Sequence, residues 1–542
     1  MKRLKLLLGM LVMGALLLST VLFASPYAPV VAPVMEIEEI WAIEDTRVES
    51  STPLVTALEN HGVPLAYEKN ENTFYCTLGL GHAESWPDIH LTAPESKNVK
   101  LVFVDDYTYD WCADAIHDGY PYQILAYTDE AFWYFDVVFT GMPLVAIECG
   151  EEITRLDTPA QVTVSWFGEK KLETPANIHL RGGTTLEQEK KNLRVEFTRA
   201  VNGKKHIVEL PGFGPRENIL LNPMVFDHTM LRDRISWALY GDMLGEGYSG
   251  AFGERKMAYA EVFLNNEYQG VYLMMEPYDP QEELSREGGK NPLTDSVYRS
   301  IKIFFEDDRP VIANPTDEYS RYELRYEPAG TKQFAPLGAY LDMLAEPDDE
   351  EFARKAACMD MESVVRYMML RQVAGLSDNV NNNLYLWARQ SHGGMTYTMV
   401  PWDMDLSWGK KPENLGAYFE CWLAFPMLDR MLVCNAQGIV DLLIERWHQW
   451  RQGIFTPEHV QGILEQYVAE LTESGALPRN AAKWDVSVND MAVDELVWFF
   501  QSRLTALDKA IEMFEDDSMA YPPFLSDIDS DLSSYRIYDP EM

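Results

Sequence analysis

Apolar and polar residues alternate with a period of two in the first half of the chain and follow a helical period in its last third. Short β-branched and aromatic runs, such as Thr73 to Leu78 and Val99 to Val104, are separated by polar turns and predict strands. From Met361 onward, apolar residues recur every three or four positions, which predicts amphipathic helices. These helices are expected over Met361 to Leu376, Phe425 to Met431, Ile439 to Trp450, Pro457 to Leu471 and Ala492 to Met513. The pattern predicts an α+β protein.

The middle of the chain adds further strands and one helix. Strands are expected over Gln161 to Phe167, Ile178 to Arg181, Lys190 to Phe197, Ala258 to Leu264 and Tyr268 to Met275. Between them, Pro223 to Leu244 opens with turn residues and continues with a helical period. Its charged residues Arg232, Asp233 and Arg234 either reach a neighbouring site or face solvent, and the sequence does not decide between the two.

The N-terminus has the order of an export signal. Three basic residues, Lys2, Arg3 and Lys5, precede the uncharged stretch Leu6 to Phe23. Cleavage after Ala24 would release the protein, whereas an uncleaved stretch of this length could stay in the membrane as an anchor. In both cases we expect the rest of the chain to be secreted or held at the cell surface, with membrane contact only through this segment.

Composition divides the remainder into four parts. Residues 25–40 contain three prolines and are expected to be a linker, and residues 41–155 a small β-rich accessory domain. Residues 160–514 form the expected main domain, and residues 515–542 an acidic tail that we expect to be disordered.

A net charge of −40 argues against nucleic acid as a partner, because phosphate binding requires a basic surface. Six widely spaced cysteines without a Cys-x-x-Cys pair indicate neither a zinc site nor a redox motif.

The strongest chemical signal lies between Asp378 and Gly409. A hairpin of Leu384 to Ala388 and Thr396 to Val400 is predicted there, joined by a turn containing two glycines. Because its second strand returns beside its first, the acidic residues at the open end come together.

The residues that converge at this open end are Asp378 and Asn383 on one side and Asp403 and Asp405 on the other. With no Lys or Arg at that end of the hairpin, the carboxylates would repel one another unless a hard divalent cation binds them. Protein kinases use an Asp, then an Asn five residues later, then a second Asp after a short hairpin. This comparison assigns Asp378 to the proton of the attacked hydroxyl, and Asp403, Asn383 and Asp405 to the metal. The alternative is an ordinary turn rich in Asp and Asn, which would account for the same residues without a metal site.

A second candidate element precedes this one. The turn Arg181 to Thr185 contains two glycines and leads into the strand Lys190 to Phe197, an order typical of the loop that covers phosphates in kinases. Since successive side chains of a strand point oppositely, only one of Lys190 and Lys191 can face the phosphates, together with Arg194. A hairpin with basic residues on its solvent face is the alternative.

The strand Tyr268 to Met275 ends at Glu276-Pro277, which is a natural hinge between two lobes. In a kinase, adenine pairs with the backbone at this place, so Glu276 is a candidate nucleotide-binding residue.

These stretches resemble the CotH family of atypical spore-coat kinases over roughly residues 160 to 510. The resemblance rests on Arg181-Gly182 with Lys190 to Phe197, on Met230-Leu231-Arg232-Asp233, on Ala260 to Leu273, on Asp378-Asn379 with Asn383 to Leu386, and on Pro401 to Gly409. It implies a bilobal, divergent kinase-like fold with a β-rich N-lobe and a helical C-lobe. It also implies an exported enzyme that uses ATP and Mg²⁺ or Mn²⁺ to phosphorylate Ser or Thr of proteins at the cell or spore surface.

The resemblance assigns phosphate contacts to Arg181, Gly182, Lys190, Lys191 and Arg194. The glycine turn departs from the family's Arg-Gly-Arg-Gly pattern, and Val297-Tyr298-Arg299 replaces its Leu-Tyr-Lys element. The altered glycine turn leaves the alternative of a non-catalytic surface or coat protein with the same fold. An unrelated carbohydrate-active or adhesive role is a further alternative, because aromatic-rich exported β-domains often bind sugars. No nucleophile elbow, zinc-protease motif or dinucleotide fingerprint supports hydrolase or dehydrogenase chemistry.

Overall fold

The computed structural model describes fifteen stretches of the chain: residues 34–79, 89–96, 98–104, 112–280, 283–284, 295–300, 318–319, 322–326, 334–376, 378–379, 383–391, 393–410, 422–423, 425–485 and 492–516. The expected export segment, residues 1–24, and all but the first two residues of the expected tail lie outside these ranges. Within the described stretches, no helix combines the length and the apolar character needed to cross a bilayer.

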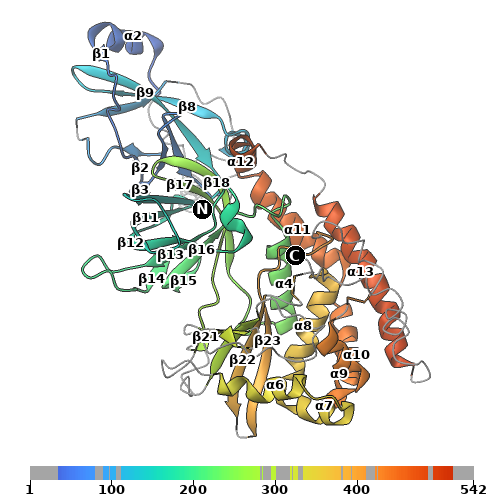
Figure 1. Ribbon diagram of the computed structural model, residues 1–542. Helices are drawn as coiled ribbons and strands as arrows, with labels where there is room; N and C mark the ends of the chain where they lie inside the picture. The colour runs from blue at the N-terminus through green and yellow to red at the C-terminus, as the bar shows by residue number, and fades with distance from the viewer. Residues whose placement is uncertain are drawn as a thin grey trace, which may run out of the picture.

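The described N-terminal part forms a six-stranded sheet with two helices. The strands run β4–β5–β9–β8–β7, with β1 parallel to β9, and β3–β2–β6 form a small separate sheet. The bounds are α2 Ile37–Thr46, β1 Val48–Glu49, β2 Glu59–Asn60, β3 Val63–Pro64, β4 Ala66–Glu68, β5 Thr73–Thr77, β6 Leu91–Thr92, β7 Lys100–Phe103, α3 Cys112–Asp118, β8 Pro121–Tyr127 and β9 Ala131–Thr140. This sheet occupies the upper left of Figure 1 and confirms the strands predicted near Thr73 and Val99.

The next strands close into a seven-stranded barrel, in the order β10–β11–β12–β13–β16–β18–β17, with β10 and β17 pairing in parallel. The bounds are β10 Leu144–Cys149, β11 Thr158–Trp166, β12 Lys170–Leu180, β13 Leu193–Phe197, β14 Val208–Leu210, β15 Gly214–Arg216, β16 Asn218–Asn222, β17 Met257–Leu264 and β18 Glu267–Met275. β14 and β15 form a separate hairpin. The closing strand β10 comes from the range expected to be the accessory domain, and the sequence did not predict the closure.

The barrel is filled by one face of each strand. In β13, Leu193, Val195 and Phe197 are buried inside, whereas Arg194 lies on the other face. The predicted alternation along this strand is therefore confirmed. However, the strand begins at Leu193, so Lys190 and Lys191 precede it rather than belong to it.

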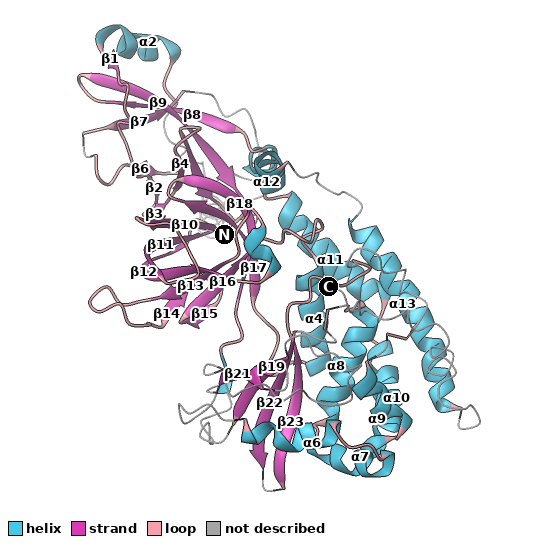
Figure 2. Ribbon diagram, in the orientation of Figure 1, coloured by secondary structure: helices cyan, strands magenta, loops and turns pink. Residues whose placement is uncertain are grey.

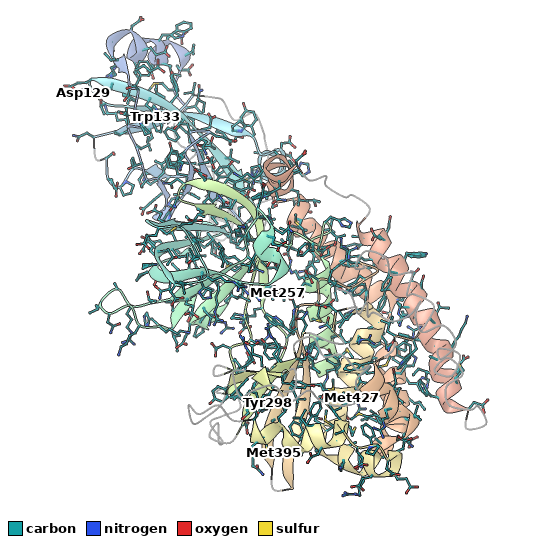
Figure 3. All side chains as sticks on the ribbon, in the orientation of Figure 1. Asp129, Trp133, Met257, Tyr298, Met395 and Met427 are labelled. Atoms are coloured by element: carbon teal, nitrogen blue, oxygen red, sulfur yellow. The ribbon has the colours of Figure 1, made fainter. Side chains whose placement is uncertain are left out.

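A second sheet, β20–β21–β19–β22–β23, lies with the helices in the lower half of the molecule (Figure 2). Its bounds are β19 Ser296–Ser300, β20 Glu318–Tyr319, β21 Tyr322–Tyr326, β22 Leu384–Ser391 and β23 Gly394–Pro401. The predicted hairpin is confirmed as β22 and β23, which pair in antiparallel register from Leu384 opposite Pro401 to Ser391 opposite Gly394. Figure 3 labels Met257 on the barrel near the middle of the molecule, and Tyr298 and Met395 below it on this second sheet.

The five predicted C-terminal helices are confirmed as α8, α9, α10, α11 and α13. The helical bounds are α4 Arg232–Leu244, α6 Gly338–Leu344, α7 Asp349–Lys355, α8 Met361–Ala374, α9 Pro426–Val433, α10 Ile439–Arg451, α11 Pro457–Thr472, α12 Ala476–Trp484 and α13 Ala492–Glu515. The central helix α8 begins where the Asp360 side chain accepts a hydrogen bond from Ser363 N–H. It ends at Gly375, whose φ of 65° is readily adopted by glycine.

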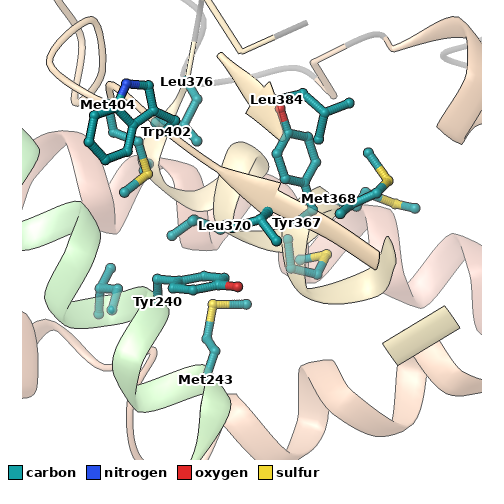
Figure 4. Packing of buried hydrophobic residues seen from close by; sticks show 14 of the residues in the cluster. Tyr240, Met243, Tyr367, Met368, Leu370, Leu376, Leu384, Trp402 and Met404 are labelled. Carbon is teal, nitrogen blue, oxygen red and sulfur yellow. The ribbon is translucent and has the colours of Figure 1, made fainter. Parts of the chain in front are cut away.

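Helices α4 and α8 share a core with the β22–β23 hairpin. Figure 4 shows Tyr240 and Met243 of α4 beneath Leu370 of α8, with Trp402 and Met404 packed above them. The chain is therefore a mixed α+β protein, as expected. The two-lobed kinase-like arrangement is not established, because a closed barrel replaces the expected β-rich lobe and a second sheet accompanies the helices.

Candidate functional site

In the loop after β23, two acidic residues alternate with two buried apolar ones. Trp402 and Met404 are buried, whereas Asp403 and Asp405 are partly exposed. The ring of Trp402 packs against that of Tyr278, with 5.1 Å between the ring centres, and Met404 is part of the core shown in Figure 4. Burial of Trp402 and Met404 anchors the loop, while the carboxylates of Asp403 and Asp405 at the alternate positions keep part of their solvent exposure.

Hydrogen bonds fix this loop on both sides of Asp403. The side-chain amide of Asn379 donates to the carbonyl oxygen of Trp402 at 2.7 Å, and Met404 N–H donates to Asp233 Oδ1 at 3.1 Å. Between these two bonds Asp403 has a φ of 57°, in the left-handed region that non-glycine residues seldom adopt. The surrounding contacts therefore determine the backbone that carries Asp403.

Asp378 and Asn383 meet at the start of the hairpin, as the sequence suggested. The Asn383 side-chain amide donates to Asp378 Oδ2 at 2.8 Å. Leu384, the next residue, pairs with Pro401, which brings this pair to the strand end that leads into Asp403. The geometric expectation that these residues converge is met, whereas their chemical roles remain predictions.

The site concentrates negative charge in a region of low solvent exposure. Burial raises the pKa of Asp405 well above its usual range, and the charges of Asp403, Asp233, Asp227 and Asp378 raise it further. Burial is also the first cause that raises the pKa of Asp233 to about 7, followed by the charge of Asp403. The charges of four other carboxyl groups thus act on Asp405, and such a concentration of negative charge favours a bound cation.

Two of these carboxylates come from the segment that begins α4, and the sequence did not assign either of them to the site. Asp227 accepts hydrogen bonds from Thr229 N–H at 3.1 Å and from Arg232 N–H at 2.8 Å, so it acts as a cap for the helix. The Arg232 side chain in turn donates to Ser407 O at 3.1 Å, two residues beyond Asp405. The only sequence signal for this connection was the Arg232-Asp233 pair in one of the CotH-like motifs.

An arginine from the barrel also reaches the acidic site. The guanidinium of Arg181, which follows β12, lies 5.9 Å from the centre of the Trp402 ring. Burial lowers the pKa of Arg181, while the charge of Asp403 opposes this shift and the charges of Arg194 and Arg299 add to it. The hairpin itself has no cation at its open end, but the fold brings one to it.

Arg194 also lies on this side of the barrel. Its guanidinium is 3.2 Å from a carboxylate oxygen of Glu196 and 3.7 Å from one of Asp279. Arg194 and Arg299 are thus close enough to act on Arg181, and of the three it is Arg181 on which the charge of Asp403 acts.

The two lysines expected at the phosphates bind elsewhere. Lys190 Nζ donates to Val271 O at 2.5 Å and to Asn480 Oδ1 at 3.2 Å, which links β18 to α12. Burial lowers its pKa to about 7. Lys191 Nζ donates to Leu186 O at 2.9 Å. None of these bonds joins a lysine to the acidic cluster.

Gly182 has a φ of 95° and is exposed, and its carbonyl oxygen accepts a hydrogen bond from the Arg155 side chain at 3.0 Å. Glu276 is almost completely buried and its carboxylate lies 2.5 Å from the Arg216 guanidinium. The Glu276 N–H donates to Lys256 O at 3.0 Å. This N–H is therefore already used within the barrel, and adenine could pair with it only by replacing that bond.

The donors at the site suit a hard divalent cation. Carboxylate and amide oxygens are the ligands that Mg²⁺ and Mn²⁺ prefer, and the buried Asp233 Oδ2 has no hydrogen-bond partner in the part of the chain that the structure describes. Among the described side chains, however, no three acidic, His or Cys groups already surround one point. The residues fit a cation chemically, and their side chains would have to move together to enclose it.

Comparison with known protein families identifies the main part of the chain. Residues 178–507 match the family described as CotH kinase protein, from the end of β12 into α13. The match includes Asp233, the Asp378–Asn383 pair and the loop that carries Asp403. No curated protein matches the chain significantly. Since the match covers more than half of the sequence, the chain belongs to the CotH kinase protein family.

Proposed function

We propose that the protein is an exported protein kinase that transfers the γ-phosphoryl group of ATP to Ser or Thr side chains of proteins at the cell or spore surface. The observation that supports this function most is the convergence of the Asp378–Asn383 pair with Asp403 and Asp405 opposite Arg181. Kinases need these parts, namely an acidic residue beside an amide, a metal-binding carboxylate and a cation for the phosphates.

Asp403, Asn383 and Asp405 would hold Mg²⁺ or Mn²⁺, which neutralises phosphate charge when it is bound. Asp378 would accept the proton of the attacking Ser or Thr hydroxyl. The oxygen of that hydroxyl would bond to the γ-phosphorus while the bond from phosphorus to ADP breaks and ADP leaves. The hydrogen bond from Asn383 orients the Asp378 carboxylate. Arg181 is better placed than Lys190 and Lys191 for contact with phosphates, because the charge of Asp403 acts on it, whereas both lysines donate to carbonyl oxygens of the chain itself. Arg194 would join it only by exchanging its ion pairs with Glu196 and Asp279 for a phosphate.

The order of basic and apolar residues at the N-terminus supports export, and the net charge of −40 suits a basic protein substrate better than an acidic one. The test uses the purified full chain with labelled ATP, Mg²⁺ or Mn²⁺, and surface-protein extracts. Label should appear in Ser or Thr of a protein, and Asp403→Ala should remove both this transfer and metal-dependent ATP binding measured by calorimetry. An Asp403→Ala variant with the parental affinity would contradict the assignment.

A non-catalytic surface or coat protein is the second candidate. The specific observation in its favour is that neither lysine after the glycine turn reaches the acidic cluster. This candidate predicts that the parental protein binds ATP without transferring phosphate with any divalent metal.

A further inference from the structure

Asp233 is the second residue of α4 and one of the least exposed carboxylates in the described part of the chain. It is 5% exposed, and its two oxygens differ in their surroundings. Oδ1 accepts the hydrogen bond from Met404 N–H at 3.1 Å, whereas Oδ2 is buried without a hydrogen-bond partner among the described residues. A buried carboxylate oxygen left in this way is costly, so a natural protein keeps one for a reason.

The surroundings of this oxygen indicate what it would bind. The charges of Asp403 and Asp227 disfavour a further negative charge on Asp233, and Arg181 is the cation that opposes them. Asp227 is different, since both of its oxygens accept hydrogen bonds from the start of α4. Asp233 is therefore the carboxylate from α4 that still has an oxygen available to a ligand, and the anionic surroundings favour a cation.

We propose that Asp233 is a further ligand of the divalent cation at Asp403: its Oδ2 would coordinate the ion while its Oδ1 holds the Met404 N–H and so fixes the loop between the two. This inference rests on the proposed function and adds a third chain segment to its metal site. It also explains why α4 begins beside the Asp403 loop. Helix α4 would provide a rigid wall of the site, and the bound ion would draw the Asp403 side chain towards it.

The test compares Asp233→Asn with the parental full chain. Asparagine keeps an oxygen that can accept the Met404 N–H but removes the charge and the stronger ligand. We expect the affinity for Mn²⁺ without nucleotide, measured by calorimetry, to fall by about tenfold to a hundredfold. We also expect the melting temperature of the metal-free variant to be no lower than that of the parent, because one of several repelling carboxylates is gone. Added Mn²⁺ should raise the melting temperature of the variant much less than that of the parent.

Asp242→Asn is the matched control, because Asp242 lies on the same helix but pairs with His459 at 2.7 Å. It should keep the parental Mn²⁺ affinity. If Asp233→Asn does not fold, Asp233→Ser serves with the same expectations. Parental Mn²⁺ affinity in a folded Asp233 variant, or an unchanged melting shift on adding Mn²⁺, would overturn the inference. A parental protein that binds no Mn²⁺ would instead count against the proposed function as a whole.

Discussion

The Asn383 side-chain amide donates a hydrogen bond of 2.8 Å to Asp378 Oδ2, across five positions of the chain. This contact holds the Asp378 carboxylate at the hairpin end from which Asp403 also emerges. It distinguishes Asp378 from a carboxylate in an ordinary turn, because its orientation is fixed by a residue that itself belongs to the site.

Asp378→Asn tests the role of this carboxylate. The variant can still accept the hydrogen bond from Asn383 but cannot take a proton, so phosphoryl transfer should slow by about 10²-fold to 10⁴-fold. ATP and Mn²⁺ affinities should stay close to the parental values, since the variant removes a proton acceptor rather than a metal ligand. Single-turnover rates together with calorimetry separate the two effects. Transfer at the parental rate would refute the assignment.

Arg181→Lys tests the cation that reaches the site from the barrel. Lysine keeps the charge but loses the planar group that lies over Trp402 and can bind phosphate oxygens in pairs. We expect ATP affinity to fall about tenfold, with Mn²⁺ affinity in the absence of nucleotide unchanged. Arg199→Lys, at an exposed position after β13, is the matched control and should bind ATP like the parent. Equal ATP affinities for both variants would show that Arg181 only packs against Trp402.

The local parts of the site could be predicted from the sequence, because they depend on neighbouring residues. The β22–β23 hairpin follows from alternation and a glycine turn, and it alone brings Asn383 towards Asp403. The alternation in β13 likewise separates Arg194 from the buried Val195.

The remaining parts depend on contacts between distant segments. Arg181 follows β12 and meets Trp402, which follows β23, through packing of two parts of the fold that are far apart in the sequence. The barrel itself closes through the pair of β10 with β17, which joins Leu144 to Glu261. Asp233 joins the site through packing of α4 against the Met404 loop, 171 residues further on. The strand pattern around Lys190 contained no signal for its bond to Asn480, which is 290 residues away.

Lys190 should make stability depend on pH. Burial lowers its native pKa to about 7 from a value of 10.5, so above pH 7 the unfolded chain binds the proton that the native protein has lost. Stability should therefore rise with pH in this window. Relative to Lys190→Met, which has no such proton, the parental free energy of unfolding should increase by about 2 kcal/mol between pH 7 and pH 9. Urea unfolding at several pH values measures this difference.

Lys190→Arg provides the contrast, because a guanidinium keeps its charge throughout this range. It should be less stable than the parent, and the difference should grow from pH 7 to pH 9. Parallel pH profiles for the parent and Lys190→Met would mean that the lysine remains charged in its buried position.

Arg479 of α12 connects three parts of the fold. Its guanidinium lies 2.9 Å from the completely buried carboxylate of Glu261 in β17 and donates to the Thr140 hydroxyl at the end of β9 at 3.1 Å. Removing one partner of a buried ion pair leaves the other charge uncompensated, so Arg479→Ala should lower the free energy of unfolding by about 3 to 5 kcal/mol.

Adding Glu261→Gln to Arg479→Ala should recover part of this loss, because the buried charge is then gone. Since the Tyr268 hydroxyl also donates to the Glu261 carboxylate at 2.8 Å, the double variant should still have a lower free energy of unfolding than the parent. Hydrogen exchange should accelerate first at the end of β9 and around Glu261 within β17, where Arg479 of α12 joins the N-terminal sheet to the barrel. A loss below about 1 kcal/mol, the usual size for an exposed pair, would show that solvent reaches this contact.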